Sequence, residues 1–252
     1  MGALDGCVAL VTGSSRGIGT AIATLFAAEG ARVAVHGRDA AAVESVRADI
    51  EADGGVALGV VADLTSYEQV EGMRSTIENT LGPIDVLVAN AGGSPVRPAR
   101  VEDISEEDWR ASVDVNLTAT FFTLKSVLPG MKERGRGAIV TMSSAAARRT
   151  TAMSPIAYAA AKAGIEQLTK NVAAQAGPFG VRANCIAPEV ILTERNFAEI
   201  PNDVQESMRL AHPIQRLGLP EDIARAALFF ATGNASWITG TVLDVAGGSV
   251  LV

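Results

Sequence analysis

A tyrosine and a lysine stand four residues apart at Tyr158 and Lys162, with three alanines between them. In a helix, residues at this spacing share one face, with their Cβ atoms about 5–6 Å apart. A free tyrosine has a pKa of about 10, too high for a base at neutral pH, and a neighbouring ammonium lowers that pKa by favouring the phenolate. The pair is suited to giving a proton to a carbonyl oxygen or taking one from an alcohol. Chance produces this spacing only ~0.03 times in such a chain; the alternative is a surface tyrosine beside a solvated lysine.

A glycine-rich segment follows the first apolar run and extends from Gly13 through Gly17 to Gly19. Glycines permit a tight turn and close approach of a ligand to the backbone, and a helix that begins there offers unpaired N–H groups to a pyrophosphate. The spacing alone is weak, because chance gives G-x-x-x-G-x-G roughly 0.25 times in such a chain. The alternative is a structural turn, but the strand before it and the helix after it favour a dinucleotide site.

These side chains need elements that bring them to one edge of a sheet. Amphipathic stretches alternate with short apolar runs, and Gly30 and Gly54 stand where two helices would end. Such alternation predicts βαβ units and a doubly wound parallel sheet with helices on both faces. We therefore expect one α/β domain over residues 1–252, with a proline-containing lid segment at about 188–219. The predicted strands are Val8–Val11, Arg32–His36, Val56–Val61, Ile84–Ala89, Ala138–Met142, Arg182–Ala187 and Thr241–Val245.

Composition limits the classes of protein to consider. The chain has 252 residues, of which 48% are hydrophobic and 19% charged, and this excludes a disordered protein. A net charge of −7 argues against general binding to nucleic acid or to an anionic membrane. No apolar run approaches the ~20 residues of a spanning helix and no secretory signal is evident, so a cytoplasmic protein is expected. The two histidines and two cysteines give no metal-ligand spacing, and Cys7 and Cys185 are expected as free, buried thiols.

The sequence resembles the short-chain dehydrogenase/reductase family over essentially its whole length, and within it the 3-oxoacyl-[acyl-carrier-protein] reductases. The family's motifs occur in the family's order. The resemblance implies a Rossmann-type sheet with the strand order 3-2-1-4-5-6-7, and an oxidoreductase that moves a hydride between a nicotinamide and a carbonyl or alcohol. The matching motifs are T-G-x-x-x-G-[IL]-G at Thr12–Gly19, N-A-G at Asn90–Gly92, V-N at Val115–Asn116, S-S at Ser143–Ser144, Y-x-x-x-K at Tyr158–Lys162, V-R-x-N…P from Val181 to Pro188, and the C-terminal blocks Ile238–Gly240 and Gly247–Gly248.

The same resemblance implies a catalytic set of Asn116, Ser144, Tyr158 and Lys162. Tyr158 would be the acid/base, Lys162 would also hold the nicotinamide ribose, and Ser144, rather than its neighbour Ser143, would bind the substrate oxygen. Asn116 would organise a kink in its helix. The cofactor contacts that the resemblance implies are Gly13, Ser15, Arg16, Gly17, Ile18, Gly19, Arg38, Asp63, Leu64, Asn90, Ala91, Gly92, Tyr158, Lys162, Pro188, Ile191 and Thr193.

The residues after the second predicted strand bear on the choice of dinucleotide. Gly37 stands where NAD-binding relatives normally carry an acid that accepts from the adenosine ribose hydroxyls. Arg38 follows, and a guanidinium grips phosphate oxygens with two parallel charged hydrogen bonds. Arg16 approaches the same phosphate in NADP-dependent relatives. Asp39 is the contrary charge, but it fits as the N-cap of the next helix. The sequence predicts NADP(H) in preference to NAD(H).

Several positions depart from the family pattern. Glu189 stands where glycine is usual, and its side chain either enters the pocket wall or points to solvent. Ala246 replaces an aspartate, which removes a local hydrogen bond. Ala174 stands where thioester reductases often have arginine, which weakens the carrier-protein interpretation. Arg148 and Arg149 are expected as a solvated pair, with attraction of an acidic partner as the alternative.

The expected function is an NADP(H)-dependent oxidoreductase acting on a small carbonyl or secondary alcohol. Two alternatives stay open: a reductase of 3-oxoacyl thioesters on acyl carrier protein, and a catalytically silent nucleotide-binding regulator, which would be expected to have lost a member of the catalytic set. The helix Ala157–Gln175 and the apolar tail Val250–Val252 predict a homotetramer. No nucleic-acid or membrane partner is expected.

Overall fold

Seven parallel strands form one sheet in the computed structural model, which describes residues 2–150, 154–194 and 200–251. The strand order is β3-β2-β1-β4-β5-β6-β7, as predicted. Observed strand ends lie within two residues of the predicted ones. The strands are β1 (Val8–Val11), β2 (Arg32–Gly37), β3 (Val56–Val61), β4 (Val86–Ala89), β5 (Gly137–Met142), β6 (Val181–Pro188) and β7 (Val242–Val245).

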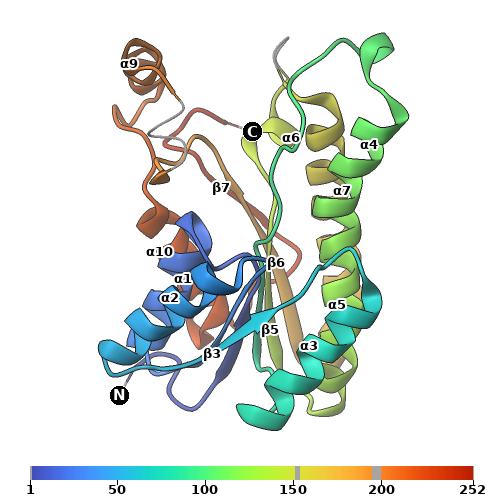
Figure 1. The fold of residues 1–252 in the computed structure, drawn as a ribbon, viewed down its shortest axis with the longest axis vertical. Helices are drawn as coiled ribbons and strands as arrows, with labels where there is room; N and C mark the ends of the chain where they lie inside the picture. The colour runs from blue at the N-terminus through green and yellow to red at the C-terminus, as the bar shows by residue number, and fades with distance from the viewer. Residues whose placement is uncertain (1, 151–153, 195–199, 252) are drawn as a thin grey trace.

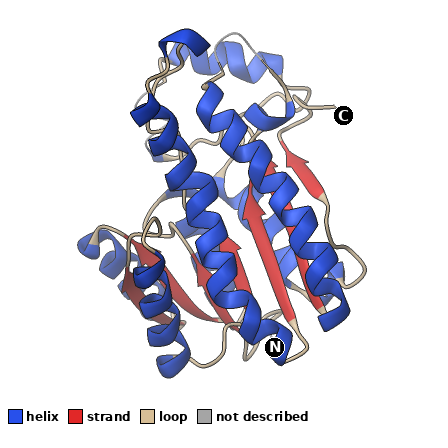
Figure 2. Ribbon diagram, turned by 90° about the vertical axis from the view of Figure 1, so that its right-hand side faces the viewer, coloured by secondary structure: helices blue, strands red, loops and turns tan. Residues whose placement is uncertain are grey.

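Helices cover both faces of the sheet, which confirms the doubly wound α/β class (Figures 1 and 2). Each layer buries its own apolar core against the sheet: Phe26 and Phe230 lie in one, and Ile77 and Leu124 in the other. Burial of such side chains stabilises the fold by roughly 1.5–3 kcal/mol each. One layer contains α1 (Gly17–Ala28), α2 (Ala40–Ala52) and α10 (Pro220–Ala231); the other contains α3 (Tyr67–Thr80), α4 (Glu106–Val113), α5 (Ala119–Glu133) and α7 (Ile156–Ala176).

Local signals in the sequence set several helix ends. The Asp39 carboxylate accepts hydrogen bonds from the N–H groups of Ala41 and Ala42 and caps α2, as predicted. Gly30 follows α1 with a φ of +88°, a backbone conformation that favours glycine. Both cysteines are free; Cys185 is buried and Cys7 is partly exposed.

Short elements surround the carboxyl ends of the strands. A π-helical turn, Asp114–Thr118, joins α4 to α5 and places Asn116 in a bend, consistent with the kink that the family resemblance implied. Above the strands lie α6 (Ala145–Arg148) and α9 (Asn202–Ala211) (Figure 1). The predicted lid at 188–219 contains α9; positions 195–199 of it, 151–153 of the loop before α7 and Val252 of the tail lie outside the described residues. The remaining short helices are Val101–Asp103, Gly177–Phe179 and Gly233–Ala235.

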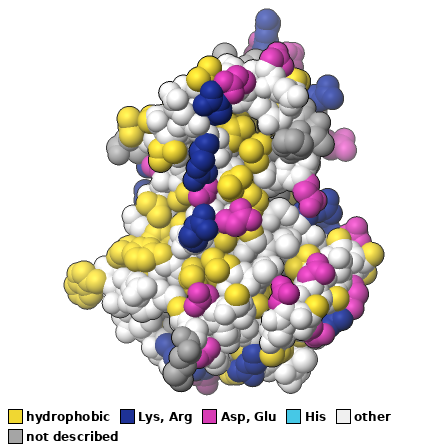
Figure 3. Space-filling view, turned by 90° about the vertical axis from the view of Figure 1, so that its left-hand side faces the viewer, with side chains coloured by type: hydrophobic (Ala, Val, Ile, Leu, Met, Phe, Trp, Pro, Cys, Tyr) yellow, Lys and Arg dark blue, Asp and Glu magenta, His cyan; other side chains and the backbone are white. Residues whose placement is uncertain are grey.

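The face beside α10 and β7 carries apolar side chains among charged ones (Figure 3). Trp237 is 99% exposed, and Phe229 of α10 and Leu243 of β7 are also exposed. Such a patch is typical of a surface that meets another protein molecule. Within the described ranges, no helix is both long and apolar enough to cross a membrane.

Candidate active site at the carboxyl ends of the strands

Tyr158, Lys162, Ser144 and Asn116 come from three helices and meet at the carboxyl end of β5. The first turns of α7 carry Tyr158 and Lys162, and Ser144 caps α6, its Oγ accepting from Ala146 N–H at 3.2 Å. A hydrogen bond joins the Ser144 and Tyr158 side chains. The Lys162 ammonium lies 5.6 Å from the centre of the Tyr158 ring. The structure thus brings the predicted catalytic residues together.

Asn116 fixes the loop that separates the catalytic residues from the glycine loop. Its amide nitrogen donates to Gly93 O and Ser112 O, both at 2.8 Å, and its Oδ1 accepts from Gly93 N at 3.0 Å. A Cβ atom on Gly92 would lie 2.5 Å from Asn116 Oδ1 and 3.3 Å from Lys162 Nζ. Only glycine therefore fits at the point where this loop passes the lysine.

The electrostatic state of the pair differs from the sequence-based expectation. Burial raises the pKa of Tyr158 above its usual value, and only the hydrogen bond from Ser144 opposes that shift. Burial also lowers the pKa of Lys162 to about 8. The expected lowering of the tyrosine pKa by the lysine is absent from this structure. The geometry is consistent with this: Lys162 Nζ donates to Met142 O at 2.8 Å and lies 5.6 Å from the centre of the Tyr158 ring.

A groove of about 430 Å³ runs from the glycine loop past the ends of β2, β3 and β4. Gly13 adopts a φ of +65°, and a Cβ there would lie 2.8 Å from Ala91 Cα, so the loop packs against the N-A-G segment only because it lacks a side chain. Asn90 Nδ2 donates to Thr12 O at 3.0 Å and to Gly13 O at 3.1 Å. The predicted cofactor residues that line this groove are Gly13, Ser15, Arg16, Arg38, Asp63, Leu64, Asn90, Ala91 and Gly92.

The shape and chemistry of the groove fit a dinucleotide. The N-terminus of α1 opens on it, and the glycine loop brings bare backbone to its wall. Arg16 and Arg38 are the cations among its lining residues, and Asp63 is the acid. Hydrogen bonds from the backbone and the hydroxyl of Thr65 hold the pKa of Asp63 below its usual range, so this carboxylate stays ionised.

The other predicted cofactor residues do not line this groove. Gly17, Ile18 and Gly19 form the first turn of α1, and Tyr158 and Lys162 lie at the catalytic end. Pro188 ends β6. A Cβ on Gly17 would lie 3.0 Å from Thr193 Cγ2, so the segment after β6 packs against the glycine loop. Ile191 lines a second cavity of about 380 Å³.

His36 is among the groove residues that the sequence did not predict. His36, at the end of β2, is 3% exposed and lines the groove beside Gly37. Its ring contacts the glycine loop and the loop after β3. The available signal was a histidine in an otherwise apolar strand directly before Gly37.

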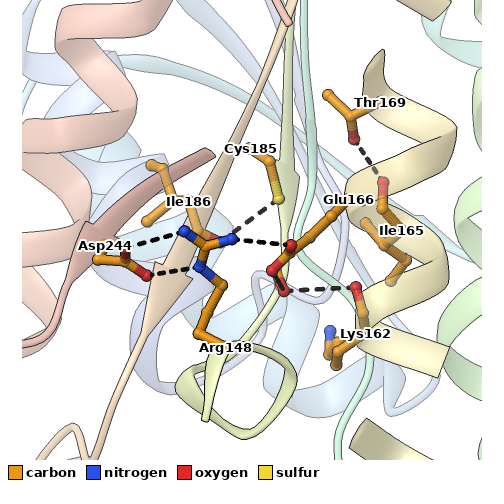
Figure 4. A network of polar contacts seen from close by, with 9 residues as sticks. Arg148, Lys162, Ile165, Glu166, Thr169, Cys185, Ile186 and Asp244 are labelled. Atoms are coloured by element: carbon orange, nitrogen blue, oxygen red, sulfur yellow. Dashed lines mark hydrogen bonds and ion pairs between the residues drawn. The ribbon is translucent and has the colours of Figure 1, made fainter. Parts of the chain in front are cut away.

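The arginine pair at the end of α6 is only partly solvated: the Arg148 side chain is 20% exposed, which contradicts the prediction, whereas the Arg149 side chain is 46% exposed. Arg148 forms ion pairs with Asp244 of β7 at 3.1 Å and with Glu166 of α7 at 3.2 Å (Figure 4). Arg149 forms an ion pair with Glu189, whose side chain is only 10% exposed. Carboxylates from α7, from β7 and from the residue that follows β6 form ion pairs with both guanidinium groups.

The Glu189 side chain therefore lies in the wall of a cavity and does not point to solvent. It lines the second cavity, and its Oε2 lies 3.6 Å from His212 Nε2. Ala246, where an aspartate is usual, packs in a small apolar cluster with Ala145 and Val250. No group of His, Cys, Asp and Glu suited to a metal ion occurs in the ranges that the structure describes.

The ion pairs of Arg148 also connect the elements that carry the predicted catalytic residues. Glu166 Oε1 accepts from Ser143 Oγ at 2.7 Å, and Ser143 Oγ also lies 3.3 Å from Lys162 O. Arg148 thus connects α6, which Ser144 caps, to the helix that carries Tyr158 and Lys162. Such contacts fix the relative positions of the two helices.

Comparison with known proteins identifies dehydrogenases and reductases as relatives of this chain. A family model described as Enoyl-(Acyl carrier protein) reductase matches residues 13–249. The chain is 37% identical to 7alpha-hydroxysteroid dehydrogenase of Escherichia coli (strain K12), covering 98% of this chain and 95% of that enzyme. It is 38% identical to D-threitol dehydrogenase of Mycolicibacterium smegmatis, covering 97% and 93%.

Solved structures agree with these matches. A structure of 7 alpha-hydroxysteroid dehydrogenase complexed with NADH and 7-oxo glycochenodeoxycholic acid superposes with a TM-score of 0.93 at 37% identity, over 98% of this chain and 95% of that one. A 3-oxoacyl-[acyl-carrier protein] reductase from Brucella melitensis superposes with a TM-score of 0.93 at 34% identity, over 99% and 93%.

Proposed function

Because the chain belongs to the short-chain dehydrogenase/reductase family and is an oxidoreductase of CH–OH/C=O pairs, we propose that its preferred cofactor is NADP(H) and that Tyr158 is its acid/base. The observation that carries the cofactor proposal is the groove wall at the end of β2. Gly37 and Arg38 stand there, with Arg16 opposite in the same groove. The 2′-phosphate of NADP(H) would meet the two cations Arg16 and Arg38, and the carboxylate of the groove, Asp63, comes from the loop after β3.

Packing at Gly37 supports the same proposal. A Cβ at this position would lie 2.7 Å from Ser15 Oγ and 2.9 Å from Val43 Cγ2, so an acidic side chain would displace its neighbours. The Asp39 carboxylate is engaged as the cap of α2. Neither the restricted space at Gly37 nor the engaged Asp39 carboxylate favours an acidic acceptor for the two adenosine ribose hydroxyls of NAD(H).

The chemistry proposed for the catalytic end uses the chain's own groups. A bound nicotinamide supplies or accepts the hydride. Ser144 Oγ, held at the cap of α6, hydrogen-bonds the substrate oxygen and stabilises the charge that develops on it. The Tyr158 hydroxyl gives that oxygen a proton, and its raised pKa keeps it protonated for reduction. After Tyr158 has given up its proton, the Lys162 ammonium on α7 supplies the proton that restores the phenol. Lys162 also binds the nicotinamide ribose.

A kinetic comparison tests the cofactor proposal. Wild type should show a kcat/KM for NADPH at least about tenfold above that for NADH, because a charged hydrogen bond contributes about 1.5–3 kcal/mol. Arg38→Ala should erase most of that ratio and leave NADH use nearly unchanged. Arg110→Ala, an exposed arginine on α4, is the matched control. Relatives have been solved with NADH and with bound NAD, and a wild type that prefers NADH would refute the proposal.

For the substrate we propose a free ketone or secondary alcohol rather than a thioester on a carrier protein. Ala174 is exposed on α7 at the position where carrier-dependent reductases often have arginine. The hydroxysteroid and threitol relatives favour free alcohols, whereas the Brucella reductase favours a thioester. A panel of hydroxysteroids, polyols and a 3-oxoacyl thioester, with and without carrier protein, separates the two. Turnover of any of them excludes a silent nucleotide-binding regulator.

We also propose that the chain is a homotetramer. The exposed Phe229, Trp237 and Leu243, together with Leu251 of the tail, form an apolar surface that a monomer would leave in water. Light scattering at micromolar concentration should give four times the 26.0 kDa chain mass. A monomer mass would contradict this proposal.

A further inference from the structure

A single imidazole bridges the two loops that form the walls of the dinucleotide groove. His36 Nδ1 lies 3.0 Å from Gly13 N in the glycine loop, and Nε2 lies 3.1 Å from Ala62 O in the loop after β3. The backbone strengthens the first connection: Ser14 N–H donates to His36 O at 2.8 Å, and His36 N–H donates to Ser14 Oγ at 2.9 Å. The His36 ring therefore contacts both loops that border the groove.

These partners fix the protonation state of the ring. A carbonyl oxygen only accepts, so Nε2 carries the proton toward Ala62, and an N–H only donates, so Nδ1 must accept from Gly13. The neutral ring satisfies both partners, and a doubly protonated ring would turn a second N–H toward Gly13 N–H. Burial is the main cause that lowers the pKa of His36, which keeps the ring neutral near pH 7.

The charged groups around the ring come from three elements. Arg38 follows β2, Asp63 follows Ala62 after β3, and Arg16 belongs to the glycine loop; all three line the same groove. Arg38 opposes protonation of His36 and Asp63 favours it. The state of the ring is thus tied to the residues that meet the adenosine half of the cofactor.

We propose that His36 is a positioning residue for the dinucleotide, whose neutral imidazole holds the glycine loop at a fixed distance from the Ala62–Leu64 loop, so that protonation of the ring in acid releases the glycine loop and weakens cofactor binding. This inference rests on the proposed use of the groove for a nicotinamide dinucleotide, but not on the preference for NADP(H). The catalytic residues lie at the other end of the cleft, so kcat at saturating cofactor should not follow the same titration.

Two substitutions separate the two contacts of the ring. His36→Asn places an amide oxygen near the position of Nδ1 and retains an acceptor for Gly13 N–H that does not titrate. His36→Gln places its amide near the position of Nε2 and retains a donor for Ala62 O, but it leaves Gly13 N–H without its partner. His212→Gln is the matched control, because His36 and His212 are the only histidines in the sequence.

Calorimetric titration with NAD⁺ between pH 5.5 and 8 tests the proposal without requiring turnover. NAD⁺ is chosen because it lacks the 2′-phosphate, whose second ionisation lies near pH 6 in phosphate monoesters. Wild type and His212→Gln should lose affinity progressively as the pH falls from 7.5 to 5.5, by less than the roughly tenfold that a histidine of ordinary pKa would give, because burial lowers the pKa of His36. His36→Asn loses the donor to Ala62 O, so it should bind about threefold more weakly than wild type at pH 7.5, at the low end of the effect of one hydrogen bond, and show a flat profile. His36→Gln should bind about three- to tenfold more weakly at pH 7.5, the effect of one hydrogen bond, and also show a flat profile.

Three results would overturn the proposal. They are a flat wild-type profile, an undiminished acid loss in His36→Asn, and wild-type affinity in His36→Gln at pH 7.5. Thermal melts of each variant verify that it is folded, and kcat at saturating cofactor should stay within about twofold of wild type, since a single lost positioning contact acts on binding. An enzyme that prefers NADH would defeat the proposed cofactor preference but leave these pH profiles as predicted.

Discussion

On the side of the dinucleotide groove, the loops are joined by hydrogen bonds between neutral groups, whereas on the side of α6 and β7 they are joined by ion pairs. Asn90 and His36 hold the glycine loop with amide and imidazole contacts. Arg148 holds α6 through two carboxylates, Glu166 and Asp244. The catalytic residues lie where the two sides meet.

The difference has an electrostatic reason. A pyrophosphate brings negative charge, and the hydrogen bonds that hold the glycine loop use neutral groups, so Arg16 is not engaged as an anchor of that loop; the carboxylate of the groove, Asp63, lies in the loop after β3. The other side receives no such charge from the cofactor, so paired charges can be used there for positioning. Burying these paired charges costs desolvation free energy. Removal of one partner therefore leaves the other as an unpaired buried charge, which destabilises the fold.

Tyr158→Phe should give the largest effect and leave both scaffolds intact, because neither uses the phenol as an anchor. Loss of the proton donor should lower kcat by about 10²–10⁴-fold, with the Kd for cofactor within about twofold of wild type. Stopped-flow turnover and cofactor titration measure the two quantities. Tyr67→Phe, the only other tyrosine in the sequence, is the control. Near-normal turnover in Tyr158→Phe would exclude the tyrosine as the acid/base.

Arg148→Met tests the charged side. It leaves Glu166 and Asp244, 10% and 18% exposed, without their shared cation. Removing one partner of a buried ion pair costs about 3–5 kcal/mol, and we expect about 3 kcal/mol here because the group is not fully buried. Urea unfolding measures the loss. The double variant Arg148→Met/Glu166→Leu should recover part of it, because one unpaired charge is then removed. An unchanged urea midpoint in Arg148→Met would show that these pairs do not support α6.

Asn90→Ala is the matching change on the neutral side. It removes two hydrogen bonds to Thr12 O and Gly13 O, so we expect about 1–2 kcal/mol of lost stability and a severalfold loss of cofactor affinity. Because no charge is involved, the difference from wild type should not change between low salt and about 1 M salt. Asn79→Ala on α3, whose side chain is exposed, is the control. A loss as large as that of Arg148→Met would contradict the contrast between the two sides.

The same contrast explains what the sequence could predict. The strands and both helical layers follow from hydrophobic alternation, the strand order follows from the family resemblance, and Asp39 was correctly expected as a cap. The predicted catalytic residues come from family motifs, and the structure places them near one another. These features depend on residues close together in the chain or on family motifs. Nine of the predicted cofactor positions line the groove for that reason.

The charged side could not be predicted in the same way. Arg148 meets Asp244 across 96 residues of sequence, and Arg149 meets Glu189 across 40. Each residue alone suggests a solvated side chain, and only the fold makes pairs of them. His36 was missed for a related reason, because its partners Gly13 and Ala62 offer backbone atoms that no residue type reveals.

The smallest expected effect concerns an ion pair at the edge of the charged side. Asp222 in the first turn of α10 accepts from Leu219 N–H at 2.9 Å and pairs with Arg216, and this pairing, with the Leu219 contact, lowers its pKa from 3.8 to about 2. The unfolded chain therefore takes up this proton first as the pH falls. The stabilisation is complete above about pH 4 and is lost as the pH falls from 4 toward 2. Because Arg216 is half exposed, solvent screening limits the effect to on the order of 1 kcal/mol.

Asp222→Asn should thus be less stable than wild type in urea at pH 6, and the difference should shrink at pH 3. Asp49→Asn, at an exposed position of α2, is the control, and a difference that stays constant between pH 6 and pH 3 would show that the pair does not stabilise the fold.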